Sequence, residues 1–263
     1  MDRKDGAMAL RREPHVLVVG GSDSSGGAGI ARDIETVSAF GLRSCLAITA
    51  VTVQTHSAVE HVKLVPSELV AAQMRAAFAA NDVAAVKIGM IGTSAAVEAV
   101  GAVLVNRQVP VVLDPVLAST SGRNLLADDA INMLRHDLMP ICRLVTPNLV
   151  ELAAFTGSSP AADEEGACRQ AEELSRTVRT AVLVKGGHVQ GTRCVDVLLQ
   201  PNQPAVRFEA PRLPRGMRGT GCMMASAVAA SLALGASLKA SVRQAKQHVF
   251  DALAGSKDIG PIS

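Results

Sequence analysis

Four consecutive residues near the C-terminal end of the chain have the types and spacing that phosphate chemistry requires. Gly219-Thr220-Gly221-Cys222 opens a stretch of helical length, residues 219–238, that carries no charged side chain. The first amides of a helix lack intrahelical partners, and the positive end of its dipole favours anions. A thiol in the first turn is expected to have a lowered pKa. The pattern predicts either a phosphate hole beside a base, as phosphoryl transfer to a hydroxyl needs, or a tight turn with a buried cysteine.

Charged residues also stand where strands are expected to end. Lys185 precedes two glycines, so it either reaches a phosphate as a mobile charge or lies solvated at a turn. Asp114 follows a short apolar run, and Glu151 ends the segment Thr146-Pro147-Asn148-Leu149-Val150-Glu151. Carboxylates near phosphates suit Mg²⁺, usually through its waters, although lone acids are also helix caps or surface charges.

A glycine-rich segment, residues 20–29, follows the first apolar run. It lacks the Lys-Ser/Thr ending of a Walker A loop and does not match G-x-G-x-x-G. Glycines let a backbone approach a ligand closely, so the segment is either a binding loop or a flexible connection.

The elements that position these residues follow from the alternation of β-branched runs with alanine-rich stretches. Strands are predicted over 15–20, 45–53, 84–88, 110–113, 144–146 and 180–184, and helices over 30–40, 67–80 (capped by Ser67), 93–106, 128–135, 149–155 and 164–178. A hairpin is predicted over 194–199 and 205–209, before two final helices from about Thr220 and Leu238. Such alternation requires crossovers, hence a mostly parallel sheet with helices on both faces and ligands at the carboxyl ends of its strands.

Composition excludes several classes of protein. The chain has 263 residues, of which 48% are hydrophobic and 19% charged, so global disorder is excluded. A basic, disordered tail is predicted over 1–14 and a single domain over 15–263. With net charge +2, no Trp, no Tyr and five Phe, no nucleic-acid partner is expected, and residues 219–238 are expected in a core rather than a membrane. Five cysteines are scattered along the chain without a C-x-x-C pair, so neither disulfides nor a zinc site are expected. A cytoplasmic location is predicted.

Seven segments, taken in order, resemble the hydroxymethylpyrimidine and phosphomethylpyrimidine kinases of thiamine biosynthesis, within the ribokinase-like superfamily. The resemblance covers about residues 15–261. The segments are GSDSSGGAGI (the 20–30 region), ITAVTVQ (48–54), KIGM (87–90), VLDPV (112–116), TPN-x-x-E (146–151), VKGGH (184–188) and GTGC (219–222), and Gly260-Pro261 also fits. Cys222 is informative, because most ribokinase-like sugar kinases carry Asp there. The resemblance implies a three-layer αβα sandwich with a mostly parallel central sheet.

The resemblance also implies roles for individual residues. Cys222 would be the general base on the substrate hydroxymethyl group, beside an anion hole of Gly219, Thr220 and Gly221. ATP would be bound by Lys185, Asn148 and Arg218, and Mg²⁺ by Asp114 and Glu151. Asp33, Gln54, Met90 and Val116 would line the aminopyrimidine pocket. A Gln amide can match the donors and acceptors of an aminopyrimidine edge, and Met90 and Val116 can cover its ring faces. A homodimer is expected.

The sequence departs from the family pattern at three places. Arg218 replaces His, Thr55-His56 replaces Asn-Thr, and Ala31-Arg32 replaces Gln-Ala. Arg218 would add a charge near the nucleotide phosphates or face solvent. The departures leave open a pyridoxal-type kinase on the same scaffold. A non-catalytic protein that binds a pyrimidine or nucleotide is a second alternative. Redox sensing through Cys222 is a third, and it follows from the lowered thiol pKa expected at the helix terminus.

Overall fold

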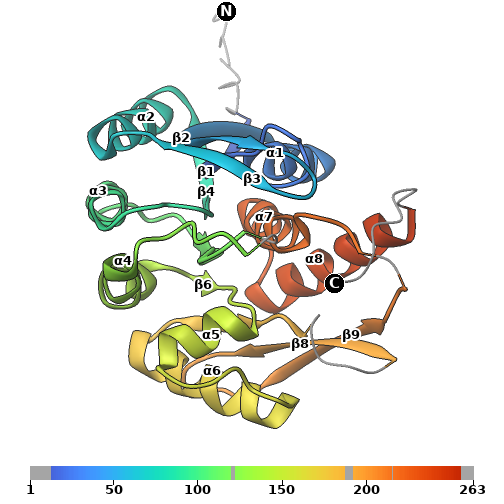
Figure 1. Ribbon diagram of the computed structural model, residues 1–263. Helices are drawn as coiled ribbons and strands as arrows, with labels where there is room; N and C mark the ends of the chain where they lie inside the picture. Colours follow the sequence, from blue (N-terminus) through green and yellow to red (C-terminus); the bar gives the residue numbers. More distant parts are fainter. Residues whose placement is uncertain (1–12, 120–121, 187–191, 215, 256–263) are drawn as a thin grey trace, which may run out of the picture.

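The computed structural model describes residues 13–119, 122–186, 192–214 and 216–255 (Figure 1). Most of the predicted N-terminal tail therefore lies outside the described residues, as do Gly187, His188, Gly260 and Pro261. Pro14, the last residue of that predicted tail, begins the first strand.

The described residues form one sheet of nine strands in the order β3-β2-β1-β4-β5-β6-β7-β8-β9. The strands are β1 (Pro14–Ser22), β2 (Arg43–Gln54), β3 (Val59–Leu64), β4 (Asp82–Ile88), β5 (Val111–Leu113), β6 (Leu144–Val145), β7 (Ala181–Val184), β8 (Arg193–Leu199) and β9 (Val206–Pro211). From β2 to β7 all neighbours are parallel, whereas β3, β8 and β9 pair antiparallel at the two edges. The predicted mostly parallel sheet and the late hairpin are confirmed.

Helices cover both faces of the sheet and make three layers. One face carries α2 (Ser67–Ala80), α3 (Ser94–Leu104), α4 (Asp128–Met133), α5 (Leu149–Thr156) and α6 (Glu164–Val178), and the other carries α1 (Gly29–Ala39), α7 (Thr220–Ala233) and α8 (Leu238–Gly255). Leu17 and Val19 of β1 pack toward α2 and α3, and Val16 and Val18 pack toward α1 and α7. Burial on both faces explains why the strands are continuous apolar runs.

The structure corrects three local predictions. β3 was not predicted, because of its six residues only Val59 is buried and the apolar signal is weak. Ser67 does not cap α2; Pro66 holds the cap position, and Ser67 is the first helical residue. The helix expected over 128–135 is α-helical only to Met133 and continues as a π-helical turn, Leu134–Leu138.

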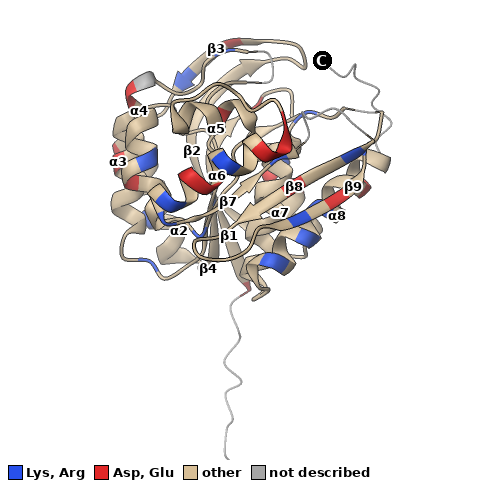
Figure 2. Cartoon of the chain, turned by 90° about the horizontal axis from the view of Figure 1, so that it is seen from below, with Lys and Arg blue, Asp and Glu red and all other residues tan. Residues whose placement is uncertain are grey.

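Residues 219–238, which the sequence analysis places in a core, contain α7. Within the described ranges, no helix has the length and apolarity needed to cross a membrane. α7 is instead buried between α1, α8 and the sheet, as its uncharged sequence requires. In the view of Figure 2, basic and acidic residues are interspersed over the helices and along β8 and β9.

Candidate active site

The ends of three neighbouring strands bring the predicted charged residues together. Asp114 follows β5, Thr146 follows β6 and Lys185 follows β7, which are adjacent in the sheet. The Lys185 Nζ lies 2.7 Å from Asp114 Oδ1, and the Thr146 hydroxyl donates to the same oxygen at 3.2 Å. Burial alone would raise the pKa of Asp114, but Lys185, Lys87 and these hydrogen bonds lower it below the ordinary value. The carboxylate is therefore ionised.

The first turn of α7 lies directly over this pair. Gly219 caps the helix with a φ of 75°, a conformation that favours glycine, and a Cβ there would lie 2.5 Å from the Gly27 carbonyl oxygen. A Cβ on Gly221 would lie 3.1 Å from Lys185 Nζ and 3.5 Å from Asp114 Oδ2. The three residues predicted as an anion hole thus begin a helix whose free amides and dipole face a lysine. The structure brings the predicted hole and the predicted phosphate lysine to one place.

Cys222 lies partly buried beside these groups, and its ionisation differs from the expectation. Burial raises the pKa of its thiol to about 11, with Lys87 opposing that change and Asp33 and Asp114 adding to it, while a backbone hydrogen bond from Gly29 lowers it. The predicted lowering was wrong because the helix terminus does not compensate for desolvation and two nearby carboxylates. The sulfur still faces ionised groups and a backbone amide rather than hydrocarbon alone.

A buried ion pair beside Cys222 was missed by the sequence analysis. Lys87 of β4 is 1% exposed, and its Nζ lies 2.8 Å from both carboxylate oxygens of Asp33, which is 0% exposed. The Ser226 hydroxyl donates to the same carboxylate at 2.7 Å. Burial alone would lower the pKa of Lys87, but Asp33, Cys222 and Asp114 raise it, so the lysine stays charged. One signal was available, namely a single lysine inside the apolar run of a central strand.

Asp33 is therefore placed differently from its predicted role. It was expected to line the aminopyrimidine pocket, but its side chain has no exposed surface and both oxygens bind Lys87. Its position suits a positioning role beneath Cys222, on which its charge acts.

The other residues predicted for the acceptor lie at the ends of β2, β4 and β5. Gln54 ends β2 partly buried, and its Oε1 accepts from the Thr52 hydroxyl at 3.3 Å. Met90 follows β4, its sulfur 3.0 Å from where a Cβ on Gly21 would lie. Val116 follows β5 and is partly buried. These strands are parallel to β6 and β7, so their carboxyl ends lie at the same edge of the sheet as the charged groups.

Glu151 and Asn148 form the capping box of α5. The Asn148 amide donates to Glu151 Oε2 at 2.8 Å, and the Glu151 amide donates to Asn148 Oδ1 at 2.9 Å. Burial raises the pKa of Glu151 to about 7, with Lys185 opposing and Asp114 adding to the shift. The side-chain oxygen of Asn148, predicted to bind ATP, is therefore engaged in the helix cap.

The predicted Mg²⁺ residues fit a cation that is bound partly by substrate. The described residues contain no group of three or more His, Cys, Asp or Glu that could hold a metal by itself. Mg²⁺, however, is usually held by one or two carboxylates together with waters and phosphates. Asp114 and Glu151 repel each other strongly enough to affect the pKa of Glu151, and a divalent cation would relieve that repulsion.

The ionisation of Glu151 predicts a pH dependence of stability. In the folded protein Glu151 keeps its proton up to about pH 7, whereas the unfolded chain loses it near the ordinary value of 4.5. The contribution of Glu151 to stability therefore falls as pH rises through that window. Glu151→Gln keeps an acceptor for the Asn148 backbone amide but cannot ionise. We therefore expect the free energy of unfolding of the variant, relative to that of the wild type, to be higher at pH 8 than at pH 5.

Urea denaturation at both pH values measures this difference. Glu98→Gln, on the exposed side of α3, is the matched control and should show the same difference from wild type at pH 5 and pH 8. An unchanged difference for Glu151→Gln would contradict the assignment.

Arg218 is bound to protein groups rather than facing solvent. It is 19% exposed; its guanidinium donates to Ser25 Oγ at 2.9 Å and to the Thr55 carbonyl at 3.0 Å, and pairs with Asp23 Oδ2 at 3.1 Å. Asp23 balances the charge of Arg218, and the expected role of Arg218 in ATP binding stays a prediction.

A second buried pair supports the turn that carries Lys185. Asp196 of β8 accepts from the Gly186 amide at 2.9 Å, and its other oxygen lies 2.8 Å from Lys246 Nζ of α8. A Cβ on Gly186 would overlap the Val195 carbonyl oxygen, 1.7 Å away, so only glycine fits. The sequence analysis missed Asp196 and Lys246, because nothing in their local pattern indicates a contact with Gly186.

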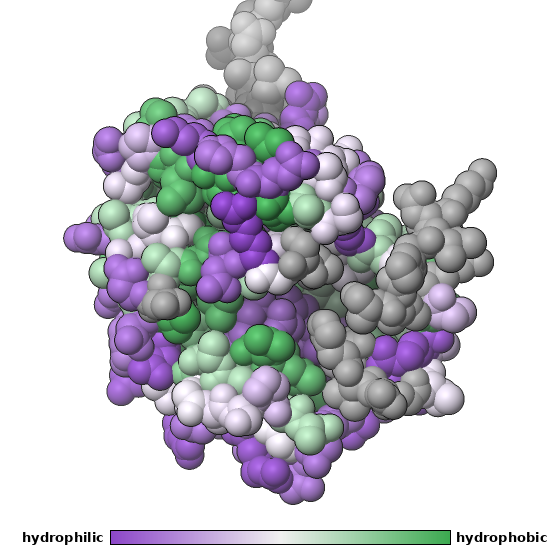
Figure 3. All heavy atoms as spheres, viewed as in Figure 1, coloured by the Kyte–Doolittle hydropathy of each residue, from purple (hydrophilic) through white to green (hydrophobic). Residues whose placement is uncertain are grey.

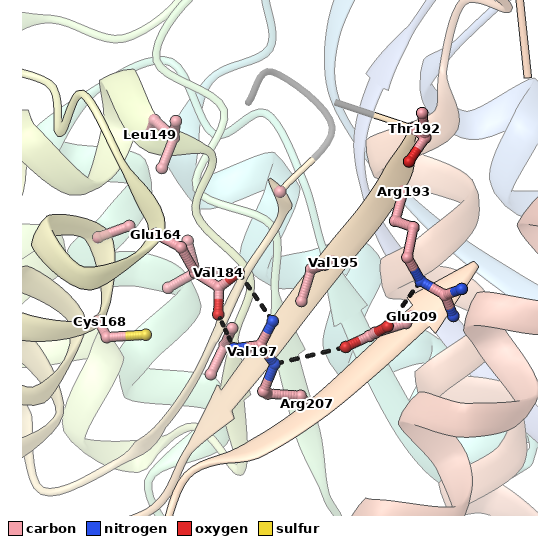
Figure 4. A pocket seen from close by; sticks show the side chains of 12 residues that line it. Leu149, Glu164, Cys168, Val184, Thr192, Arg193, Val195, Val197, Arg207 and Glu209 are labelled. Carbon is pink, nitrogen blue, oxygen red and sulfur yellow. Dashed lines mark hydrogen bonds and ion pairs between the residues drawn. The ribbon is translucent and has the colours of Figure 1, made fainter. Parts of the chain in front are cut away.

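Two cavities adjoin the site. One of about 310 Å³ lies between α6 and the β8–β9 hairpin, with an apolar floor that includes Leu149 and Val184 and a rim of paired charges, Glu164–Arg207 and Arg193–Glu209 (Figure 4). The other, of about 290 Å³, lies beside β3; among its lining residues are Met90, Val62, Leu64, Gly92 and Arg123. Of the residues predicted for the site, only Met90 lines either cavity.

Comparisons with known proteins agree with this geometry. A family model described as phosphomethylpyrimidine kinase matches residues 23–262. A hydroxymethylpyrimidine/phosphomethylpyrimidine kinase of Rhizobium meliloti (strain 1021) is 42% identical over 241 residues, 91% of this chain and 90% of the relative. Among solved structures, Bacillus subtilis pyridoxal kinase in an ADP complex has a TM-score of 0.85 at 27% identity, covering 94% of each chain. Phosphomethylpyrimidine kinase of Clostridium difficile 630 has a TM-score of 0.78 at 32% identity, covering 92% of this chain and 99% of that one.

The fold and the site together define a ribokinase-like kinase, a phosphotransferase in which a helix N-terminus, a lysine and two carboxylates meet at the carboxyl edge of a three-layer αβα sandwich. The predicted fold class is confirmed. With the family model matching most of its length, the chain belongs to the phosphomethylpyrimidine kinase family.

Proposed function

We propose that this protein uses ATP and Mg²⁺ to phosphorylate 4-amino-5-hydroxymethyl-2-methylpyrimidine, its monophosphate, or both, in thiamine biosynthesis. The observation that carries the proposal is the approach of Gly221 at the start of α7 to Lys185 and Asp114, with Cys222 as the next residue. Family membership supports the same reaction.

The chemical step is a transfer of the γ-phosphoryl group to an acceptor oxygen. The bond between the γ-phosphorus and its bridging oxygen breaks, and a bond to the acceptor oxygen forms. The amides of Gly219, Thr220 and Gly221 would stabilise charge on the transferring group, and Lys185 would neutralise nucleotide phosphate. When the acceptor is an alcohol, its proton passes to the Cys222 thiolate. When the acceptor is a monophosphate, the attacking oxygen is already ionised and needs no base.

Mg²⁺ would be held by Asp114 and Glu151, directly or through waters. When bound, it supplies positive charge to the nucleotide phosphates. Asn148 would orient Glu151 through the capping box, so its contribution to ATP binding is indirect.

The acceptor would lie between the ends of β2, β4 and β5. Gln54 would pair with the aminopyrimidine edge, and Met90 and Val116 would cover the ring faces, the first from beside a cavity of about 290 Å³. Asp33 would act from beneath by holding Lys87 near Cys222.

A pyridoxal kinase on the same scaffold is the second candidate, because a pyridoxal kinase is among the structures most similar to this chain. The two candidates and a non-catalytic binder separate in one assay, in which the purified protein receives ATP, Mg²⁺ and each acceptor in turn. We expect kcat/KM to be higher for a pyrimidine acceptor than for pyridoxal. The reverse order would favour pyridoxal kinase, and no ATP consumption with any acceptor would leave only a binding protein.

We further propose a cytoplasmic homodimer. The five cysteines are all free, which suits a reducing compartment. Exposed apolar side chains gather on the outer edge of the sheet and on α2, namely Val51, Val53, Leu64 and Leu69. Apolar surface also interrupts the polar surface in the upper part of Figure 3, where Figure 1 places β2 and β3. A second copy would cover such a surface, and sedimentation equilibrium measures the mass that decides it.

A further inference from the structure

Arg218 connects three segments that lie far apart in the sequence. It precedes the first turn of α7, it contacts Asp23 and Ser25 of the glycine-rich segment, and it donates to the carbonyl of Thr55, the residue after β2. The Asp23 side chain in turn accepts from the amide and hydroxyl of Ser25, at 2.9 and 2.7 Å. The guanidinium is therefore the centre of a small bonded cluster rather than a free charge.

Two glycines allow this cluster to form. Gly219, next to Arg218, is in the left-handed conformation and lies against the Gly27 carbonyl, so the arginine is brought onto the glycine-rich segment. A Cβ on Gly27 would lie 3.2 Å from Arg218 Nη1 and 3.5 Å from His56 Nδ1. The absence of a side chain at Gly27 leaves room for both residues, which are two of the places where the sequence departs from its family's pattern.

A second contact joins the glycine-rich segment to the end of β2. The Ser24 hydroxyl donates to the backbone carbonyl of Gln54 at 2.9 Å and accepts from the backbone amide of Gln54 at 2.8 Å. Gln54 is thus fixed through its backbone to a segment that Arg218 ties to α7. Loss of Arg218 would keep the Ser24–Gln54 contact but would remove the hydrogen bond to the Thr55 carbonyl, the residue that follows Gln54.

We propose that Arg218 is a positioning residue for the acceptor substrate. It holds the glycine-rich segment and the turn after Gln54 against the start of α7. The side-chain amide of Gln54 is thereby oriented toward the acceptor, while Cys222 and the anion hole stay in place. The inference rests on the proposed function for its kinetic consequence, but the clamp itself is a property of the ligand-free protein and is measured separately.

Hydrogen exchange followed by mass spectrometry tests the clamp without substrate. In Arg218→Ala we expect faster exchange in peptides covering 23–28 and 55–58, and unchanged exchange in β5–β7. Arg218→Lys can keep the Asp23 pair but cannot also reach Thr55, so it should restore protection in 23–28 more than in 55–58. Arg135→Ala is the matched control, because Arg135 donates to the Phe155 carbonyl at 2.9 Å outside the site. Unchanged exchange in both segments of Arg218→Ala would overturn the clamp, whatever the activity of the protein.

Steady-state kinetics test its consequence. Losing hydrogen bonds from a charged donor should raise KM for the acceptor about 10-fold or more in Arg218→Ala, with kcat and KM for ATP changed less than about threefold. Asp23→Asn should raise the same KM, and adding it to Arg218→Ala should have little further effect, because both changes break one cluster. A rise in KM for ATP alone would overturn the proposal and assign Arg218 to the nucleotide. If Arg218→Ala shows the expected faster exchange but the wild type turns over no acceptor, the proposed function and the acceptor role are refuted and the clamp is retained.

Discussion

Replacing Cys222 with alanine is expected to lower kcat for the hydroxymethyl acceptor by about 10²- to 10⁴-fold, the contribution typical of a general base. The loss should be much smaller with the monophosphate acceptor, whose attacking oxygen carries its own negative charge. ATP and acceptor binding should persist, because the amides at the start of α7 and Lys185 are unchanged. Rapid-quench measurement of product with each acceptor provides the comparison, and equal rates for wild type and variant would exclude Cys222 as the base.

The pH profile of the same reaction gives an independent reading of the thiol. Since burial raises the pKa of Cys222 to about 11, kcat of the wild type with the alcohol should still be rising at pH 9. Cys222→Asp supplies a carboxylate in place of the thiol, so we expect activity above that of Cys222→Ala and a rising limb displaced to lower pH. Ser226→Ala, one turn further along α7, contacts Asp33 but not the reacting atoms and should leave the limb near its wild-type position. A limb that moves in Ser226→Ala but not in Cys222→Asp would contradict the role of the thiol.

Replacing Lys87 with methionine is expected to lower the free energy of unfolding by about 3–5 kcal/mol, because it leaves the fully buried Asp33 without its cation. The double variant Lys87→Met/Asp33→Asn should recover much of this loss, since no net charge then remains buried. Lys63→Met on β3 is the matched control, because Lys63 is exposed, and should change stability by less than about 0.5 kcal/mol. Guanidinium denaturation of the four proteins makes the comparison, and a cost for Lys87→Met no larger than that of the control would show that the pair is not structurally important.

The direction of the pH effect in that variant is also defined. Burial raises the pKa of Asp33, and Lys87 is the main group that opposes this. Without Lys87 the folded-state pKa rises further above the unfolded value, so the variant should lose stability as pH increases above the unfolded value. The deficit relative to wild type should therefore be smaller at pH 5 than at pH 8.

Much of the fold was predictable because local signals and tertiary structure agree. α6 begins and ends where the pattern places it, since Asp163 caps its first turn and its apolar side fits the sheet. The strands buried on both faces are continuous apolar runs, and even their short members were found. β3 was missed because it lies at an edge, where exposure removes the apolar pattern.

The site was predictable in its location but less so in its chemistry. Asp114 and Lys185 were expected at one edge because the carboxyl ends of parallel strands meet there, and they do. The Lys87–Asp33 pair joins residues 54 positions apart, and Arg218 contacts partners 163 to 195 positions away, so no local pattern indicates either. The thiol pKa was wrong in direction because a sequence reveals a helix terminus but not the desolvation around it.

The ion pair between Asp196 and Lys246 gives α8 a structural role beyond covering the sheet. Through Asp196 the Lys246 ammonium of α8 supports the peptide that follows Lys185, so α8 helps to fix the position of the Lys185 side chain beside Asp114. A chain cut short before Lys246 would strand a carboxylate in the interior next to that peptide. Because Lys246 belongs to α8, the position of the Lys185 side chain depends on that helix as well as on β7.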